Sequence, residues 1–470
     1  MKLTKIVATL SDKHCEPGFI RSLYEAGMNV VRINTAHQVP EGALRLIENV
    51  RTVSDKIPVM IDTKGPEIRT SALGEAIEVK QGMSIRLFGG NGESHGDQLF
   101  VSYEGIHSVL EPGNLVMIDD GDIALKVIHK TPDHLVCDVL NSGLIKNRKS
   151  VNLPGIALEL PSLSDRDREY IEFAIAHHVS FIAHSFVRSK EDVLAIQEIL
   201  NRHQSKIKII AKIENQQGVD NIDEILPHVY GVMVARGDLA IEIPAEQIPV
   251  IQRELIDKCI NQRKTVIVAT QMLHSMITNP RPTRAEIADI ANAVFSGTDA
   301  LMLSGETAYG AYPLESVQIM ARTARVAEQS REFMENKNIE PHNNEISGFL
   351  AKSAVRAVAS LNARAIITDT DTGKTAIYLA SFRGKCPIYA QCYDMQVMRE
   401  LALNFGVYPE FISVETSKKQ FTKVVLERLL NSKYLDSEDL VVVLAGNFGK
   451  KVGPSFVEVS TAQNLLQSTL

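Results

Sequence analysis

The fold of this chain is decided by two apolar runs that each end in an acid, Ile209-Ile210-Ala211-Lys212-Ile213-Glu214 and Gly231-Val232-Met233-Val234-Ala235-Arg236-Gly237-Asp238. Each run indicates a strand buried on both faces, because apolar residues follow one another without alternating with polar ones. Folds with parallel strands carry their chemistry at the carboxyl ends of such strands. We therefore expect an α/β protein with functional groups at these two strand ends.

Glu214 and Asp238, the acids at the two strand ends, form with Lys212 the first candidate site. Two carboxylates next to a lysine indicate a divalent metal beside a cation that can stabilise a phosphoryl group. The alternative is that they are ordinary strand-end residues solvated at a loop. One carboxylate alone favours that alternative, whereas the combination of both runs favours a functional site.

Further short apolar runs alternate with helix-length amphipathic segments in two separated regions of the chain. Together with the first two runs they predict eight strands: Lys5–Leu10, Val30–Asn34, Pro58–Asp62, Phe181–Ser185, Lys208–Glu214, Gly231–Arg236, Thr265–Thr270 and Ala300–Ser304. Eight such units predict a (β/α)₈ TIM barrel with its catalytic groups at the carboxyl ends of the strands.

The two regions are separated by a stretch rich in Gly, Asp and Asn, with short alternating segments such as Ser84–Phe88 and Leu135–Leu140. This pattern predicts a small β-barrel inserted into a barrel loop, where it can act as a lid. After the polar stretch Glu335–Asn344, helices and strands alternate again and predict an open α/β domain. The expected domains are a catalytic barrel (1–67 and 159–340), the β-barrel lid (68–158) and a C-terminal regulatory domain (341–470).

Composition limits the class of protein. With 470 residues, 44% of them hydrophobic and 23% charged, the chain is typical of a globular protein of several domains. The net charge of −7 gives no reason to expect nucleic-acid binding or a basic membrane-binding face. No apolar stretch approaches the roughly 20 residues of a membrane span, and the N-terminus lacks the apolar core of a signal peptide. Five scattered cysteines without C-x-x-C spacing are typical of free thiols, so we expect a cytoplasmic location.

Polar side chains also follow other predicted strands. Arg32 and Asn34 close an early strand, Asp62 and Thr63 close the next, and Thr270 ends another. The planar donors of arginine match the oxygens of a phosphate group. Each residue alone is equally compatible with a loop held by salt bridges or backbone bonds, but their placement on one barrel face favours function. The sequence holds no G-x-x-x-x-G-K-[ST] phosphate loop and no histidine pair at metal-binding spacing.

These residues lie in segments that resemble the pyruvate kinase family over nearly the whole chain. The matching segments, in order, are Thr4–Leu10, Ala26–Asn34, Asp62–Thr70, Ser150–Gly155, Lys208–Gly218, Met233–Glu246, Ala269–Met276, Pro280–Glu286 and Met302–Ala308. The resemblance implies transfer of a phosphoryl group from phosphoenolpyruvate to ADP, giving pyruvate and ATP in glycolysis. It also implies an allosteric homotetramer.

By position, the resemblance implies that Glu214 and Asp238 hold Mg²⁺ or Mn²⁺. Lys212 would stabilise charge on the phosphoryl group in transfer, and Arg32 would hold the phosphate. The substrate carboxylate would be bound by the N–H groups of Gly237 and Asp238, assisted by Thr270, which would also lie on the proton route to the enolate.

The resemblance implies three further sites. A potassium ion would be held by Asn34, Asp62 and Thr63. The nucleotide would be approached by Asn34, His37, Arg69 and Lys149. A phosphate-binding loop for an effector would be formed by Thr370, Thr372, Gly373, Lys374 and Thr375, with a plain helix start as the alternative.

The chain departs from the family pattern in a few places. Ala36 stands where serine is usual and removes one hydroxyl from the potassium site, although Glu67 matches the potassium-dependent members. Ser11-Asp12 replaces a Gly-Pro pair near the nucleotide, and Tyr309 replaces a common lysine. The segment from Gly446 to Gly453 is short and poor in threonine, from which we expect altered or absent activation by a sugar phosphate.

Two alternative functions are left open. A metal-dependent pyruvate-enolate lyase on a similar barrel would share the acid pair, but it would need neither Lys212 nor a lid inserted after residues 62–69. A catalytically weak, effector-sensing relative is suggested by Ala36, Ser11-Asp12 and Tyr309. Retention of Lys212 and of the two acids argues against the second alternative.

Overall fold

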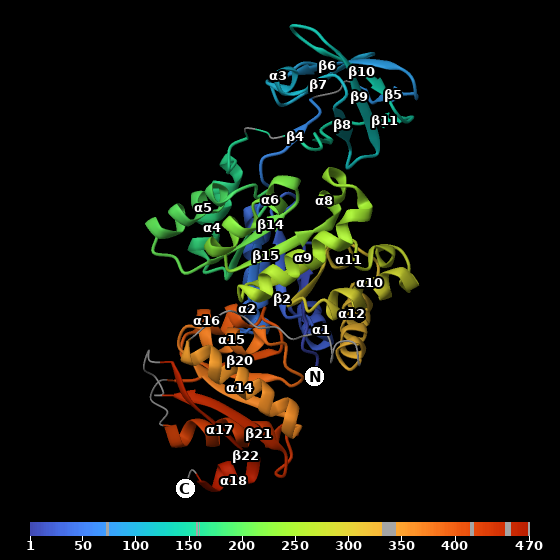
Figure 1. The fold of residues 1–470 in the computed structure, drawn as a ribbon. Helices are drawn as coiled ribbons and strands as arrows, with labels where there is room; N and C mark the ends of the chain where they lie inside the picture. The colour runs from blue at the N-terminus through green and yellow to red at the C-terminus, as the bar shows by residue number, and fades with distance from the viewer. Residues whose placement is uncertain are drawn as a thin grey trace.

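The computed structural model describes residues 1–71, 75–156, 158, 160–330, 345–413, 418–446 and 453–468. They form three parts that follow one another in space, with a β-rich domain at one end, a barrel in the middle and an α/β domain at the other end (Figure 1). None of the helices in these ranges is long and apolar enough to cross a lipid bilayer.

The central part is a closed barrel of eight parallel strands in the order β1-β17-β16-β15-β14-β13-β3-β2. Its strands are β1 (Lys5–Thr9), β2 (Val30–Asn34), β3 (Val59–Asp62), β13 (Phe181–His184), β14 (Lys208–Ile213), β15 (Gly231–Ala235), β16 (Thr265–Ala269) and β17 (Ala300–Leu303). The predicted (β/α)₈ barrel is confirmed, and no strand boundary differs from its expected position by more than one residue.

Helices surround the barrel, and local sequence explains where several of them begin. The longer ones are α1 (Pro17–Ala26), α2 (Pro40–Val53), α4 (Asp165–Ala176), α5 (Lys190–Arg202), α9 (Ile248–Asn261), α10 (Arg284–Phe295) and α12 (Pro313–Glu328). The short ones are α6 (Gln216–Asp220), α7 (Ile222–Ile225), α8 (Arg236–Glu242) and α11 (Gly305–Ala308). Helix α4 starts at a capping box in which Ser164 and Asp167 bond each other's backbone N–H groups, and Thr283 with Glu286 does the same for α10.

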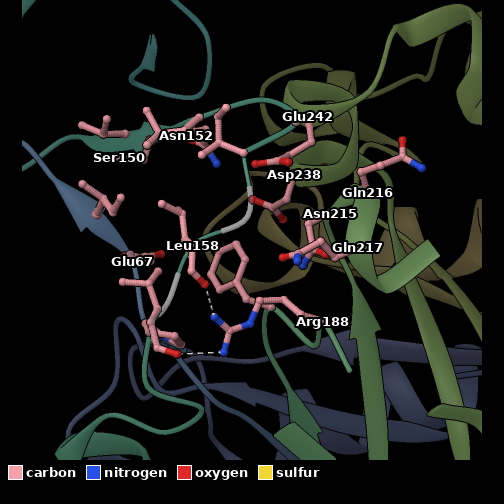
Figure 2. A pocket seen from close by; sticks show the side chains of 18 of the residues that line it. Glu67, Ser150, Asn152, Leu158, Arg188, Asn215, Gln216, Gln217, Asp238 and Glu242 are labelled. Atoms are coloured by element: carbon pink, nitrogen blue, oxygen red, sulfur yellow. Dashed lines mark hydrogen bonds between the residues drawn. The ribbon is translucent and has the colours of Figure 1, made fainter. Parts of the chain in front are cut away.

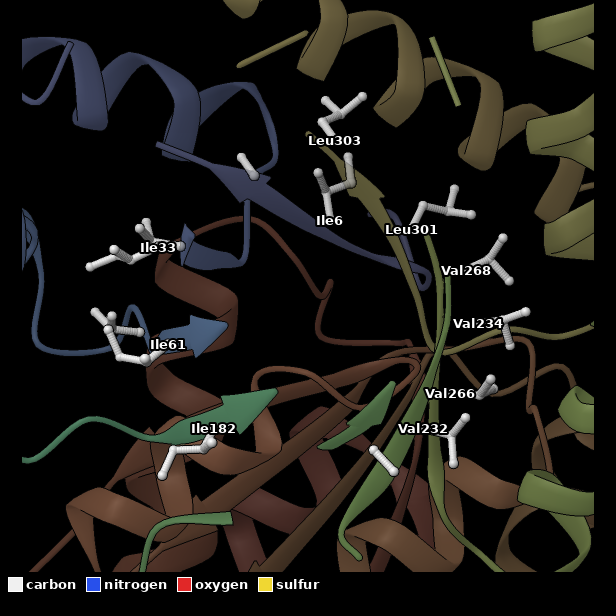
Figure 3. Packing of buried hydrophobic residues seen from close by; sticks show 14 of the residues in the cluster. Ile6, Ile33, Ile61, Ile182, Val232, Val234, Val266, Val268, Leu301 and Leu303 are labelled. Atoms are coloured by element: carbon white, nitrogen blue, oxygen red, sulfur yellow. The ribbon is translucent and has the colours of Figure 1, made fainter. Parts of the chain in front are cut away.

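Alternation along the strands separates two apolar layers. Outward residues such as Ile33, Ile61, Val232 and Val266 pack between the strands and the helices (Figure 3). The inward set fills the barrel and includes Val7, Val30, Met60, Phe181, Ile210, Met233, Ile267 and Met302. Arg32, Asp62 and Lys212 each lie two residues beyond Val30, Met60 and Ile210, so the pleat puts these three charges on the inward row. They therefore converge at the carboxyl end of the barrel.

The inserted β domain has a seven-stranded sheet in the order β4-β12-β8-β9-β10-β6-β7 and a two-stranded sheet of β11 and β5. The bounds are β4 (Ile68–Arg69), β5 (Ile77–Val79), β6 (Ser84–Gly89), β7 (Gln98–Val101), β8 (Leu115–Ile118), β9 (Ile123–Lys130), β10 (Leu135–Val139), β11 (Gly143–Ile145) and β12 (Ser150–Asn152), with helix α3 (Ile106–Val109). A bridge between Thr70 and Val101 joins the two edges, so the large sheet closes on itself around its own core. This agrees with the expected small β-barrel.

The C-terminal domain is a five-stranded sheet in the order β20-β19-β18-β21-β22, with apolar clusters on both faces. Its strands are β18 (Ala365–Thr370), β19 (Ile388–Cys392), β20 (Val407–Phe411), β21 (Leu440–Gly446) and β22 (Pro454–Thr461). Its helices are α14 (Ile346–Leu361), α15 (Lys374–Ser381), α16 (Met395–Leu401), α17 (Lys418–Asn431) and α18 (Ala462–Ser468). All strand pairs are parallel except β21 with β22.

The C-terminal domain covers the amino end of the barrel strands, which we call the barrel floor (Figure 1). Arg383 forms an ion pair of 2.7 Å with Asp299, which precedes β17, and both side chains are only 3% exposed. Tyr230, which precedes β15, donates a hydrogen bond of 2.6 Å to Asn404. The domain therefore lies opposite the end of the barrel that carries the candidate site. The polar stretch 335–344, and the domain boundary expected there, lie outside the described residues.

Candidate active site

Lys212 lies at the centre of the candidate site. Its side chain comes from β14 and is buried, and Nζ lies 2.7 Å from Oγ of Ser185, 2.8 Å from Oε1 of Glu214 and 3.0 Å from Oδ1 of Asp62. An ammonium group has three hydrogens to donate, and three acceptors surround this one. Burial alone would lower the pKa of Lys212, but the charges of Asp62 and Glu214 outweigh it and raise the pKa above its ordinary value. Lys212 is therefore a fixed, permanently charged cation.

Asp62 links Lys212 to a second buried cation. Nε of Arg32 lies 2.6 Å from Oδ2 of Asp62, and another nitrogen of the guanidinium donates to Oγ1 of Thr9 over 2.9 Å. Burial tends to raise the pKa of Asp62, but Arg32 and Lys212 lower it by more, so the group is a carboxylate. The predicted residues Arg32, Asp62 and Lys212 thus form one ion-paired row across neighbouring strands.

Glu214 and Asp238 bring negative charge to the same place. Glu214 is 2% exposed, and its Oε2 accepts a 2.7 Å hydrogen bond from the N–H of Phe186. Asp238 lies in the first turn of α8, directly after β15. Burial raises the pKa of Asp238, the charge of Glu214 raises it further, and Lys212 opposes both, which leaves the pKa at about 7. The two carboxylates follow the neighbouring strands β14 and β15, and the negative charge of each opposes the ionisation of the other.

A bound cation would relieve this repulsion. Within the described ranges, no group of three or more His, Cys, Asp or Glu side chains is arranged to hold a metal ion. The protein therefore offers two carboxylates and not a complete cage. This suits Mg²⁺, which usually binds through one or two carboxylates and completes its shell with substrate oxygens and water. The residues present fit the expected ion.

Thr270 follows β16 in a left-handed conformation, with φ of +66°. A β-branched residue rarely adopts this conformation, so its neighbours must enforce it. Arg236 donates to the carbonyl of Thr270 over 2.8 Å and is itself paired with Asp289 at 2.7 Å. Oγ1 of Thr270 accepts the N–H of Gly237 over 2.7 Å and donates to the carbonyl of Ala269 over 2.7 Å. The N–H of Gly237 that the resemblance gives to the substrate carboxylate is therefore bonded to Thr270 in this structure.

A cavity of about 230 Å³ lies between the barrel mouth and the β domain. Figure 2 shows Asp238 and Glu242 facing it from the barrel side, with Ser150 and Asn152 on the side of the β domain. Burial raises the pKa of Glu242 to about 7, although a hydrogen bond from the backbone of Gly155 opposes the shift. The cleft thus joins Asp238, one of the two expected metal ligands, to residues of the inserted domain.

Charged side chains of the barrel hold both connections to the β domain. Arg188 donates to the carbonyls of Leu158 and Leu160 over 3.0 Å each, where the chain returns to the barrel (Figure 2). On the outgoing connection, Asp167 accepts the N–H of Gly65 over 3.3 Å. Gly65 has φ of +73°, which favours glycine. The position of the β domain over the barrel is therefore anchored at both of its connections.

The residues of the expected potassium site lie together at the ends of β2 and β3. Asn34 pairs with Asp62 in the strand register, and Thr63 follows directly. Oδ1 of Asn34 accepts the N–H of Ala36 over 3.0 Å, and Oγ1 of Thr63 accepts the N–H of Ser185 over 3.1 Å. Ala36 adds no oxygen from its side chain. The structure thus brings the three expected residues together, with their oxygens engaged in contacts within the protein.

The expected nucleotide residues come from both sides of the cleft. Arg69 and Lys149 are neighbours at the base of the β domain, where the N–H of Thr70 donates to the carbonyl of Lys149 over 2.8 Å. Each is paired with an acid: Arg69 with Glu67 at 2.5 Å, and Lys149 with Asp119 at 2.8 Å. His37 lies on the barrel after β2 and is exposed. Asn34, at the end of β2, is partly exposed. The four residues are thus divided between the two domains.

The expected effector loop lies far from this cleft, at the start of α15. Oγ1 of Thr370 accepts the N–H of Gly373 over 2.9 Å, and Gly373 has φ of +83°. Thr372 and Lys374 are exposed, Thr375 is buried, and Lys374 is paired with a glutamate at 3.0 Å. The companion segment from Gly446 to Gly453 lies for the most part outside the described residues.

Two family models match the chain. One, described as the barrel domain of pyruvate kinase, covers residues 1–317, and the other, described as the alpha/beta domain of pyruvate kinase, covers residues 349–459. The chain belongs to the pyruvate kinase family. It is therefore a phosphotransferase, and its relatives are named pyruvate kinase.

Several relatives that are named pyruvate kinase are similar to this chain over most of its length. Pyruvate kinase of Borreliella burgdorferi is 43% identical over 99% of this chain and 98% of its own length. The enzyme of Clostridium acetobutylicum is 39% identical over 95% of this chain and 96% of its own. That of Geobacillus stearothermophilus is 41% identical over 98% of this chain and 81% of its own. These relatives give no support to the lyase alternative.

Three residues of the site were not expected to have a role there. Ser185 contacts Lys212, Arg188 holds the return connection, and Glu242 faces the cleft. Ser185 ends a predicted strand, as Thr270 does, so its position was a usable signal. Arg188 and Glu242 lie beyond strand ends, in segments where an isolated charge indicates nothing specific.

Proposed function

We propose that the chain transfers the phosphoryl group of phosphoenolpyruvate to ADP and so forms pyruvate and ATP. The observation that carries the proposal is the cluster at the barrel mouth, in which Lys212 contacts Glu214 and Asp62 within 3.0 Å. Phosphoryl transfer depends on positioning and on neutralising charge, and this cluster supplies both. The cleft above it leaves room for substrates between two domains.

In this proposal an oxygen of the β-phosphate of ADP attacks phosphorus, and the bond between phosphorus and the enol oxygen breaks. Arg32 holds the phosphate, because a guanidinium binds two of its oxygens at once. Lys212 faces the same group and stabilises the negative charge on the oxygens in transfer. Asp62 lies between the two cations and fixes their directions through bonds of 2.6 Å and 3.0 Å.

Glu214 and Asp238 would hold Mg²⁺, or Mn²⁺ in its place. When bound, the ion would neutralise charge on the carboxylate and phosphate of the substrate. Its binding requires Asp238 in the charged form, which the raised pKa of about 7 makes available near neutral pH. The Glu214 carboxylate, which pairs with Lys212 in this structure, would then contact both Lys212 and the metal ion.

The departing enolate must receive a proton to become pyruvate. The substrate carboxylate would bind the N–H groups of Gly237 and Asp238 at the start of α8, where the helix dipole favours an anion. It would thereby replace Thr270 as the acceptor of the Gly237 N–H. The hydroxyl of Thr270, released from this bond, would lie on the route by which the proton reaches the enolate.

The remaining expectations concern the potassium ion, the nucleotide and assembly. Asn34, Asp62 and Thr63 would hold K⁺ next to the phosphate. Asn34, His37, Arg69 and Lys149 would contact ADP as the β domain closes over it.

We also infer a homotetramer, which light scattering after gel filtration tests. The loop at Thr370–Thr375 would bind the phosphate of an effector, and titration with fructose 1,6-bisphosphate tests whether it activates.

A coupled assay for pyruvate tests this function and its ions. With phosphoenolpyruvate, ADP and Mg²⁺, we expect turnover that rises at least about tenfold on replacing Na⁺ with K⁺ and that stops when Mg²⁺ is chelated. Ala36→Ser should lower the K⁺ concentration needed for half of the maximal rate, because it restores a hydroxyl. Pyruvate released without ADP would instead indicate hydrolysis of phosphoenolpyruvate, and absence of turnover would support the lyase or the weak relative.

A further inference from the structure

Ser185 follows strand β13 and lies inside the catalytic cluster, but the proposed reaction gives it no role. It is 2% exposed. In the barrel, β13 lies between β3 and β14, so Ser185 stands between Thr63, which follows β3, and Lys212 on β14. A buried hydroxyl that contacts the central lysine of the site requires an explanation.

The hydroxyl of Ser185 takes part in two short hydrogen bonds. Nζ of Lys212 donates to Oγ of Ser185 over 2.7 Å, and Oγ of Ser185 donates to the carbonyl oxygen of Thr63 over 2.6 Å. Oδ1 of Asp62 is a more distant acceptor, at 3.3 Å. An ammonium group has only hydrogens to give and a carbonyl oxygen has only lone pairs, so the single hydrogen of the hydroxyl points at Thr63. A lone pair of Ser185 is thereby aimed at Lys212.

The backbone of Ser185 is fixed by the same threonine. The N–H of Ser185 donates to Oγ1 of Thr63 over 3.1 Å, and the N–H of Thr63 donates to the carbonyl of Ala183 over 2.9 Å. Gly65 closes the space on another side, since a Cβ added there would lie 2.9 Å from Cβ of Ser185. Ser185 is therefore a rigid support for the long side chain of Lys212.

The three acceptors that surround Nζ of Lys212 are not equivalent. Asp62 and Glu214 are carboxylates, at 3.0 Å and 2.8 Å, whereas Ser185 is neutral. Because all three N–H groups are in use, Lys212 must release one bond to contact a phosphoryl oxygen. A bond between two ions is stronger than a bond from an ion to a neutral hydroxyl. The bond to Ser185 is therefore the least costly to release.

We propose that Ser185 is a positioning residue for the proposed phosphoryl transfer. Its hydroxyl holds Nζ of Lys212 between the two carboxylates before the substrate arrives. The N–H that Ser185 accepts is the one that Lys212 then gives to the phosphoryl oxygen. Donors fixed in advance raise the rate because no reorientation remains to be made during the reaction. The inference rests on the proposed function and adds to it a residue that acts through Lys212.

Removing the hydroxyl should therefore change the rate and not the binding of substrate. Arg32, which would hold the phosphate, is fixed by Asp62 and Thr9 and keeps its place. Lys212 loses one of its three supports, and a misplacement of about 1 Å can cost about 10²-fold in rate. For Ser185→Ala we expect kcat to fall by about 10- to 100-fold and KM for phosphoenolpyruvate to stay within about threefold.

Ser180→Ala is the matched control, because it removes a hydroxyl at the other end of the same strand. Ser180 precedes β13 at the barrel floor and is buried, and its Oγ has no hydrogen-bond partner among the described residues. This variant should keep the kcat and KM of the wild type.

Ser185→Cys tests for rescue, since a thiol is a weak acceptor and a weak donor. Its kcat should lie between those of the wild type and Ser185→Ala. It also keeps most of the side-chain volume, so it carries the same tests if thermal melting shows that Ser185→Ala does not fold.

Steady-state kinetics gives both constants, and crystals of Ser185→Ala give a second readout that needs no turnover. We expect Nζ of Lys212 to lie about 1 Å or more from its position in wild-type crystals. The inference is overturned by a kcat within about twofold of the wild type, by a loss in KM alone, or by an Nζ that has not moved. A wild-type protein without turnover would refute the proposed function instead, and the crystals would still decide whether Ser185 holds Lys212.

Discussion

Replacing Lys212 with methionine is expected to lower kcat for phosphoryl transfer by about 10³-fold or more. Methionine keeps much of the length of the side chain but removes the charge that faces the transferred group. The neighbouring carboxylates keep other partners, since Asp62 remains paired with Arg32 at 2.6 Å and Glu214 with the N–H of Phe186 at 2.7 Å. Steady-state kinetics with the coupled assay measures the loss.

Two controls accompany the Lys212→Met variant. Lys258→Met makes the same chemical change at a half-exposed site on α9 and should turn over normally. Removing one member of a buried ion pair costs roughly 3–5 kcal/mol, so circular dichroism and thermal melting must show that Lys212→Met still folds. Turnover within about tenfold of the wild type in a folded Lys212→Met protein would refute the role given to this lysine.

Glu214→Gln is expected to weaken Mg²⁺ binding and to lower kcat, each by about two orders of magnitude. Glutamine has nearly the same shape, and its carbonyl oxygen can still accept the N–H of Phe186. The substitution nevertheless removes one of the two charges that attract the ion, and it also leaves Lys212 with one carboxylate fewer. Titration of activity with Mg²⁺ separates the change in metal affinity from the change in kcat.

Glu254→Gln is the matched control for this metal prediction, because Glu254 is exposed on α9 away from the cleft. It should require the same Mg²⁺ concentration as the wild type. If Glu214→Gln also reached half of its maximal rate at the wild-type Mg²⁺ concentration, Glu214 would not be a metal ligand.

The barrel and the centre of its site could be predicted because both depend on local sequence patterns. A continuous apolar run marks a strand buried on both faces, and a charge two residues beyond an inward residue continues the inward row. Arg32, Asp62 and Lys212 were therefore recognisable one strand at a time. Their pairing through Asp62 depends on which strands are neighbours in the closed barrel, and sequence order does not give that directly.

Other features depend on contacts between distant segments and could not be predicted. The left-handed conformation of Thr270, which places its hydroxyl against the N–H of Gly237, is enforced from Arg236. Strands β20 and β22 form the two edges of their sheet, and β20 contains Pro409, which argues against a strand in sequence alone. The cavity between the barrel mouth and the β domain arises only when these two domains pack together.

The most direct test of the central claim is anomalous diffraction from crystals grown with Mn²⁺ and phosphoenolpyruvate. The account predicts one Mn²⁺ peak about 2.1 Å from a carboxylate oxygen of Glu214 and from one of Asp238, with Nζ of Lys212 directed at the substrate phosphate. A Mn²⁺ peak bound elsewhere, with both carboxylates free of metal, would contradict it.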